Sequence, residues 1–133
     1  PLQAYAGDET YMRVTNEIFK PVVESFRPQM LFISAGFDAH WNDPITSLGL
    51  STRGYYEMSK KLVEIAGEYC DGKIVFVLEG GYDPHNVAHG AAAVFDALTN
   101  SQLNKDANDP SPYADVDHES RIHEILKWHG ISQ

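Results

Sequence analysis

The sequence has one cysteine, few basic residues and no long apolar segment. Cys70 cannot form an intrachain disulfide, and at the apolar end of a predicted helix it is expected to be a small buried hydrophobe. A single thiol fits a reducing compartment, and the first residues show no basic and apolar signal peptide, so we expect a cytoplasmic protein. No apolar segment is long enough to span a membrane, so no membrane partner is expected.

Basic residues number 10 against 19 acidic ones, which gives the 133-residue chain a net charge of −9. Nucleic-acid binding needs clustered Lys and Arg side chains, so we expect no nucleic-acid partner. The acidic balance is compatible with a cationic substrate, although most acidic proteins simply have solvated acidic faces. The sequence also lacks a glycine-rich phosphate loop, a nucleophile elbow and a Cys–His pairing, so it gives no support for those three kinds of site.

The rest of the chain is organised around residues 30–44. Residues 30–33 form an unbroken apolar run of strand length, and the sequence then turns polar, with Asp38, His40 and Asp43 within six residues. Continuous apolar runs are typical of strands that are buried on both faces of a parallel sheet. Because open α/β sheets bind ligands beyond the carboxyl ends of their strands, these three side chains are expected at a site.

A second apolar run, residues 74–78, also ends in small and polar residues. These are Glu79, Gly80, Gly81, Tyr82 and Asp83. Between the two runs, apolar side chains recur at helical spacing from residue 55 to 69, with Ser51 or Thr52 as the N-cap. The pattern predicts a βαβ unit with two polar strand ends on one edge of the sheet.

Three further helices are predicted. The first follows Asp8 as its N-cap, should kink or break at Pro21, and ends at residues 27–28. Another starts at Pro84, with Asp83 as its cap. Its apolar face is rich in alanine and comprises Val87, Ala88, Ala91, Ala92 and Phe95. The last helix covers about residues 118–129 and follows a polar linker or surface loop over residues 100–117.

Residues 1–99 are therefore expected to form the core of the chain. Two strands cannot make the sheet that three helices with apolar faces would cover. We expect the chain to be part of a larger α/β layer.

The two strand-end motifs closely resemble those of zinc-dependent histone deacetylases. The first motif runs from Ser34 to His40 and continues to Asp43 and Pro44, and the second runs from Leu78 to Tyr82. The likeness is strongest to the class II and bacterial deacetylase-like branch, which includes acetoin-utilisation proteins and acetylpolyamine amidohydrolases. It covers roughly residues 1–100 and corresponds to the C-terminal part of a deacetylase domain. The resemblance implies a three-layer, parallel-sheet fold of the arginase/deacetylase type, and a substrate that is an acylated lysine or polyamine.

The resemblance also implies roles for single residues. Asp43 matches the third protein ligand of the catalytic Zn²⁺, and the Tyr82 hydroxyl matches the donor to the substrate carbonyl and its oxyanion. Leu50 matches a position that lines the acyl-lysine tunnel, and Gly80 and Gly81 let the backbone approach a ligand.

Each of these roles has a purely structural alternative. Asp43 fits an Asx-Pro turn, Tyr82 fits a tyrosine packed at a strand end, and Leu50 fits an ordinary core leucine. Asp38 and His40 form an Asp-x-His and leave a local metal site as an alternative, but their place in the motif favours hydrogen bonds that support the metal ligand or fix the loop.

His85 and His89 have the i, i+4 spacing of a helical metal pair. Asn86 stands where the metalloprotease pattern has its catalytic glutamate, and the sequence shows no third ligand. We interpret them as a surface pair.

The paired histidines of the resembled family and its upstream Asp-x-His have no counterpart here. A single carboxylate does not hold zinc tightly, so this chain alone is not expected to be an active deacetylase. We expect the missing N-terminal part of the domain, or self-association, to complete its sheet. The alternatives are a non-catalytic interaction module that reuses the fold and, less favoured, an arginase-type ureohydrolase, whose Asp-rich motifs are missing.

Overall fold

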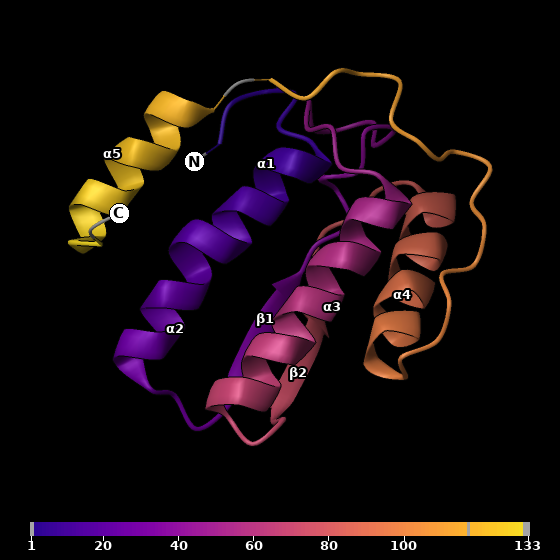
Figure 1. The fold of residues 1–133 in the computed structure, drawn as a ribbon. Helices are drawn as coiled ribbons and strands as arrows, with labels where there is room; N and C mark the ends of the chain where they lie inside the picture. Colours follow the sequence, from indigo (N-terminus) through magenta and orange to yellow (C-terminus); the bar gives the residue numbers. More distant parts are fainter. Residues whose placement is uncertain (1, 117, 132–133) are drawn as a thin grey trace.

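A computed structural model describes residues 2–116 and 118–131 (Figure 1). Its elements, in chain order, are α1 (Asp8–Arg13), the π-helical segment η1 (Val14–Phe19), α2 (Lys20–Phe26), β1 (Leu31–Ala35), α3 (Thr52–Tyr69), β2 (Ile74–Leu78), α4 (Pro84–Leu98) and α5 (Glu119–His129). Within these described ranges, no helix is both long and apolar enough to cross a membrane.

The two strands pair in parallel and are joined by α3, which confirms the predicted βαβ unit. Leu31 lies opposite Ile74, and the register continues to Ala35 opposite Leu78. The second strand has the predicted bounds, whereas the first begins one residue later than predicted and continues through Ser34 and Ala35. Both strands therefore deliver their polar motifs to the same edge of the sheet.

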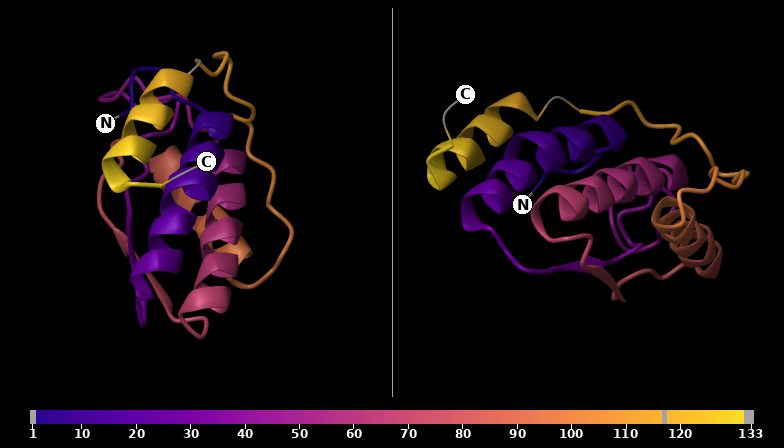
Figure 2. Two further views of the ribbon diagram at one scale, coloured as in Figure 1. Left: turned by 60° about the vertical axis from the view of Figure 1, so that its left-hand side comes forward. Right: turned by 60° about the horizontal axis from the view of Figure 1, so that its bottom comes forward.

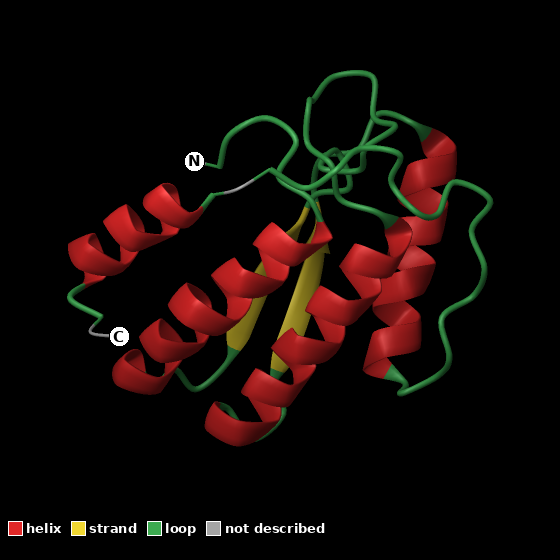
Figure 3. Cartoon of the chain, turned by 45° about the horizontal axis from the view of Figure 1, so that its top comes forward, coloured by secondary structure: helices red, strands yellow, loops and turns green. Residues whose placement is uncertain are grey.

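The helices α1 to α3 cover one face of the strand pair and leave the other open, as the views of Figure 2 and the cartoon of Figure 3 show. Burial alternates along the strands accordingly: Leu31 is buried, whereas its neighbour Phe32 is 70% exposed. Val75 and Val77, opposite Phe32 and Ser34, are also exposed. A strand with one bare apolar face is what a part of a larger layered sheet would show.

Two of the predicted helix caps are confirmed. The Ser51 hydroxyl accepts a hydrogen bond from Gly54 N at 3.1 Å, and Asp83 Oδ1 accepts one from Asn86 N at 3.0 Å. Pro84 occupies the first turn of α4, where its missing N–H costs nothing. These caps fix where α3 and α4 begin, and therefore where each strand-end loop stops.

The predicted cap of the first helix is wrong, and the helix does not break at Pro21. Asp8 is not the cap: Gly7 is, and the Asp8 carboxylate instead accepts hydrogen bonds from the Ser51 backbone N–H and hydroxyl at 2.8 and 2.6 Å. Pro21 does not break the helix, because the preceding turns widen into η1 and the proline then sits in the first turn of α2. A π-helical segment changes which carbonyls need an N–H partner, so a proline can follow it without interrupting the helical path.

The buried face of α4 also differs from the prediction. Gly90, Ala93, Val94 and Ala97 are buried on this helix, whereas Phe95 is 67% exposed. The predicted alanine-rich face was placed too far round the helix, because α4 packs chiefly against α3 rather than flat on the sheet. Phe95 instead lines an apolar hollow of about 270 Å³ beside Phe76 and Leu78 of β2.

The remaining elements follow the predicted pattern. Cys70 is buried in a core cluster with Val23, Leu31 and Ile65, as expected for a small hydrophobe. The last helix packs Ile122 and Leu126 against Ile18 of η1. Between α4 and α5, the described loop residues run over the ends of the other helices (Figure 1).

Candidate active site

Backbone hydrogen bonds join the two strand ends. Glu79 N donates to Ala35 O at 3.1 Å, and Phe37 N donates to Gly80 O at 2.7 Å. The ladder therefore continues beyond β1 and β2 into both motifs. The loop after β1 then folds back, with Leu50 N donating to Ala39 O and Trp41 N donating to Leu50 O.

Asp43 lies in this loop and is buried, with only 7% of the residue exposed. Its Oδ1 accepts a hydrogen bond from Ile45 N at 2.8 Å, and its Oδ2 accepts one from Tyr82 N at 3.0 Å. The first contact is the Asx turn that the sequence allowed, and the second ties the loop to the end of the other strand. Each carboxylate oxygen retains a further lone pair, so Asp43 can still coordinate a cation.

Tyr82 follows two glycines whose backbones are closely packed. A Cβ at Gly80 would lie 2.5 Å from Asp38 Oδ2, and one at Gly81, where φ is +136°, would lie 2.6 Å from a Val87 methyl. Larger residues are therefore excluded at both positions. The Tyr82 residue is 58% exposed, so its side chain is not confined to the core of this chain.

Asp38 and His40 have different surroundings. The Asp38 carboxylate lies against the backbones of Gly36 and Gly80, and its carbonyl accepts a hydrogen bond from the Thr46 hydroxyl. His40 is completely buried; its Nδ1 accepts from Asn42 N at 3.2 Å, and its Nε2 lies 3.5 Å from Thr52 Oγ1. Burial lowers the pKa of His40, which favours the neutral imidazole that these contacts require.

A cavity of about 500 Å³ lies beside the strand ends. Asp38, Leu50, Glu79 and Gly80 line it together with apolar side chains of η1 and α3, whereas Asp43 and Tyr82 do not. Leu50 is completely buried, in a cluster with Phe37 and Tyr55. The structure thus brings the Asp43 carboxylate to the Tyr82 backbone, although neither residue lines this cavity.

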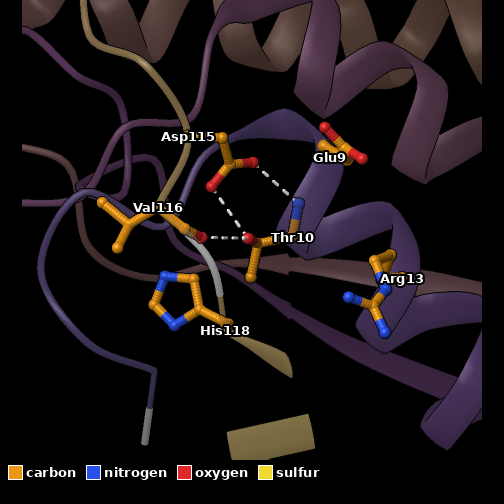
Figure 4. A pocket seen from close by; sticks show the side chains of 6 residues that line it. All are labelled: Glu9, Thr10, Arg13, Asp115, Val116 and His118. Carbon is orange, nitrogen blue, oxygen red and sulfur yellow. Dashed lines mark hydrogen bonds between the residues drawn. The ribbon is translucent and has the colours of Figure 1, made fainter. Parts of the chain in front are cut away.

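A second cavity, of about 280 Å³, lies between α1 and the loop before α5 (Figure 4). Asp115 accepts hydrogen bonds there from the N–H and hydroxyl of Thr10, each at 2.8 Å, and from Gly7 N at 2.8 Å. Burial alone would raise the pKa of Asp115, but these hydrogen bonds outweigh it and hold the pKa below its usual value. None of the predicted site residues lines this cavity, so we assign it to loop anchoring.

One pair of residues was misinterpreted from the sequence. His85 and His89 are not simply a surface pair, because Asp106 from the loop after α4 reaches both imidazoles. Asp106 lies 17 residues beyond His89 in a polar loop, and no local spacing marks it as a partner. Only the path of that loop across α4 brings the three side chains together.

The sequence of residues 1–98 matches the model of the histone deacetylase domain. The chain belongs to the histone deacetylase family. The predicted resemblance is thereby confirmed, and the matched span contains both strand-end motifs.

Similar curated proteins come from archaea, plants and bacteria. The chain is 56% identical over 82 residues to a probable deacetylase of Archaeoglobus fulgidus, and this alignment covers 62% of this chain and 23% of that protein. It is 39% identical over 98 residues to the chloroplastic histone deacetylase 14 of Arabidopsis thaliana (74% and 23% covered). It is 32% identical over 99 residues to a histone deacetylase-like amidohydrolase of Pseudomonas aeruginosa (74% and 26% covered). The chain thus spans about a quarter of the length of these relatives.

Solved deacetylase structures share the fold. The HD domain of HDA15 aligns with a TM-score of 0.74 at 26% identity, covering 94% of this chain and 32% of that one. The histone deacetylase Clr3 aligns with a TM-score of 0.77 at 27% identity, covering 94% and 20%. These alignments confirm the predicted α/β fold of the arginase/deacetylase type.

Proposed function

We propose that this histone deacetylase family chain is the C-terminal part of a zinc-dependent amidohydrolase that cleaves acyl groups from lysine or polyamine amides. The observation that carries the proposal is the buried Asp43 carboxylate, held at the strand ends by the backbone N–H of Tyr82. The backbone N–H of the residue proposed as the oxyanion donor thereby contacts the side chain proposed as a metal ligand. Such preorganisation is what a hydrolytic site requires.

Asp43 suits a zinc ligand because its two oxygens are oriented by the N–H groups of Ile45 and Tyr82 and keep lone pairs for a metal. Bound zinc would supply an activated water and polarise the substrate carbonyl. A catalytic zinc site uses three protein ligands, of which this chain offers one. The other two, and the general base, would come from the part of the domain that precedes these residues.

Tyr82 would donate its hydroxyl to the carbonyl oxygen of the substrate and hold the oxyanion that forms there. Its exposed side chain leaves the hydroxyl available to a substrate that binds between this chain and the rest of the domain. Removal of one such donor typically costs about 3 kcal/mol of transition-state stabilisation. Gly80 and Gly81 support this role because larger residues would collide with Asp38 and Val87.

Asp38 and His40 would act through Asp43 rather than on the substrate. His40 holds the loop through Asn42 and Thr52, and Asp38 packs under the second strand end. Both would keep the Asp43 carboxylate in place without coordinating the metal. Leu50, buried beside the same loop, would place an apolar wall near the acyl-lysine tunnel.

The test uses the complete domain that contains these residues, assayed on acetyl-lysine peptides and acetylpolyamines. Asp43→Asn removes a charged ligand, so zinc affinity should fall by at least about tenfold and added zinc should partly restore activity. Asp71→Asn, which changes an exposed carboxylate at the far end of α3, is the matched control and should keep wild-type zinc content. A complete domain that neither binds zinc nor cleaves either substrate would instead support the non-catalytic module.

A further inference from the structure

Three potential metal ligands come together where the loop after α4 crosses that helix. His85 and His89 stack at i, i+4 on α4, with ring centroids 4.2 Å apart. His85 Nε2 lies 2.9 Å from Asp106 Oδ1, and His89 Nδ1 lies 3.9 Å from Asp106 Oδ2. One ligand atom from each residue can be chosen so that all lie within 4.8 Å of one another.

The carboxylate is the fixed member of this group. The Asp106 side chain is completely buried, and Thr52 Oγ1 and Asn108 N donate to it at 2.5 and 2.9 Å. Among the described residues, no Lys or Arg lies within ion-pair distance of it. A buried carboxylate in such surroundings needs a positive partner, and the imidazoles are the groups placed to supply or coordinate one.

The two imidazoles are the adjustable members. Their side chains are 44% and 33% exposed, so both rings lie at the surface beside the buried carboxylate, where water can reach them. Tetrahedral zinc with bonds of about 2.0–2.2 Å places its ligand atoms roughly 3.3–3.6 Å apart. The separations of 2.9 and 3.9 Å end on different oxygens of Asp106, and one ligand atom from each of the three residues lies within 4.8 Å of the others, so small shifts of the side chains would bring them to this spacing.

We propose that His85, His89 and Asp106 form a binding site for a divalent transition-metal ion, with Zn²⁺ as the preferred ion. Two imidazoles and one carboxylate with an open position are a zinc-type donor set, whereas Mg²⁺ and Ca²⁺ favour oxygen ligands throughout. Asp106 lies beyond residues 1–98, the part that matches the family model. The site does not depend on the proposed catalytic role of Asp43.

The bound ion would fasten the loop after α4 to the first turns of two helices. His85 and His89 belong to the start of α4, and Thr52, which holds Asp106, is the first residue of α3. Thr52 Oγ1 also lies 3.5 Å from the buried His40 ring in the loop that carries Asp43. The site would therefore stabilise the fold next to the strand ends.

The test titrates the metal-free, tag-free chain with zinc chloride by calorimetry and follows thermal unfolding with and without zinc. We expect one equivalent to bind and to raise the melting temperature. His85→Ala, His89→Ala and Asp106→Asn should each weaken the affinity by at least about tenfold, because each removes a ligand. His123→Ala, which removes an exposed imidazole on α5, is the matched control and should bind like the wild type.

Asp43→Asn separates this proposal from the proposed function, since zinc binding to the chain should survive that change. Circular dichroism in the absence of zinc is the control that tests whether each variant is folded. Failure of the wild-type chain to bind zinc, or wild-type zinc affinity in the three ligand variants, would overturn the proposal. The three residues would then be a hydrogen-bonded loop anchor and nothing more.

Discussion

Gly54 shows how closely single residues are packed around the loop that carries Asp43. A Cβ at this position would lie 2.1 Å from Asp8 Oδ1 and 2.7 Å from a Leu50 methyl. The same Asp8 carboxylate holds Ser51, the cap of α3, so the contact joins α1, α3 and the strand-end loop. The absence of a side chain at Gly54 therefore lets these three segments pack closely together.

Two glycines of α3 give opposite predictions for the same substitution. Gly54→Ala should destabilise the chain by about 1–3 kcal/mol, because the added methyl group displaces the Asp8 carboxylate. Gly67→Ala, in the same helix with nothing within 4 Å of its Cβ, should stabilise by about 0.5–1 kcal/mol through helix propensity alone. Urea unfolding of the two variants measures both values, and equal effects would contradict the packing described at Gly54.

At the scale of elements, local sequence rules were sufficient where the determining groups are close in sequence. The caps at Ser51 and Asp83, the second strand and the burial of Cys70 all depend on neighbours within one turn or on short apolar periodicity. Asp8 was misassigned because its carboxylate binds Ser51, 43 positions away, instead of its own helix. Local sequence rules cannot predict that a distant partner will bind a side chain that could also cap its own helix.

In the candidate site, too, the sequence predicted the features set by local motifs and missed those set by distant partners. The motifs placed Asp43 and Tyr82 at neighbouring strand ends, because parallel strands bring their carboxyl ends to one edge. The contact of His85 and His89 with Asp106 was missed, since it depends on the path of an irregular loop. The exposure of Phe95 was missed because helix periodicity does not say which neighbour a face will meet.

The loop before α5 gives a pH prediction at this scale. Asp115 has a lowered pKa in the folded chain, so its stabilising effect is fully present above its unfolded pKa of about 3.9 and is lost as the pH falls through the lower folded value. Asp115→Asn should therefore cost about 1 kcal/mol near neutral pH, and the difference from the wild type should shrink below about pH 4.

Urea unfolding across this pH range measures the effect. Asp71→Asn changes a carboxylate whose side chain is 90% exposed and serves as the control, with no comparable loss at neutral pH. If Asp115→Asn showed the same deficit at acidic and neutral pH, the ionised carboxylate would not be what anchors the loop to Thr10.

At the scale of the whole molecule, the open face of the two-stranded sheet dominates. Phe32, Val75, Val77 and Leu78 are exposed apolar residues on or beside it, and Phe95 extends this surface from α4. Large exposed apolar patches are rare on proteins that work as monomers, and unpaired strand edges invite further pairing. The chain spans about a quarter of the length of its relatives, and we propose that this surface contacts the rest of a deacetylase domain.

The isolated chain should therefore self-associate through this face. Replacing Phe32 and Val77 together by lysine should shift the sedimentation profile toward the monomer, because both side chains lie on the open face. Phe26→Lys, at an exposed position at the end of α2, is the control and should leave association unchanged. A wild-type chain that sediments as a compact monomer at high concentration would contradict this prediction.

The most direct test of the proposed function is the turnover of Tyr82→Phe in the complete domain, measured as kcat on an acetyl-lysine peptide. The change removes one hydroxyl and keeps the ring, so zinc content and folding should be unaffected. We predict a fall in kcat of roughly a hundredfold or more that added zinc does not reverse, because the hydroxyl acts on the tetrahedral state. Tyr69→Phe, at the opposite end of α3, should keep wild-type turnover. Wild-type kcat in Tyr82→Phe would contradict the role proposed for Tyr82.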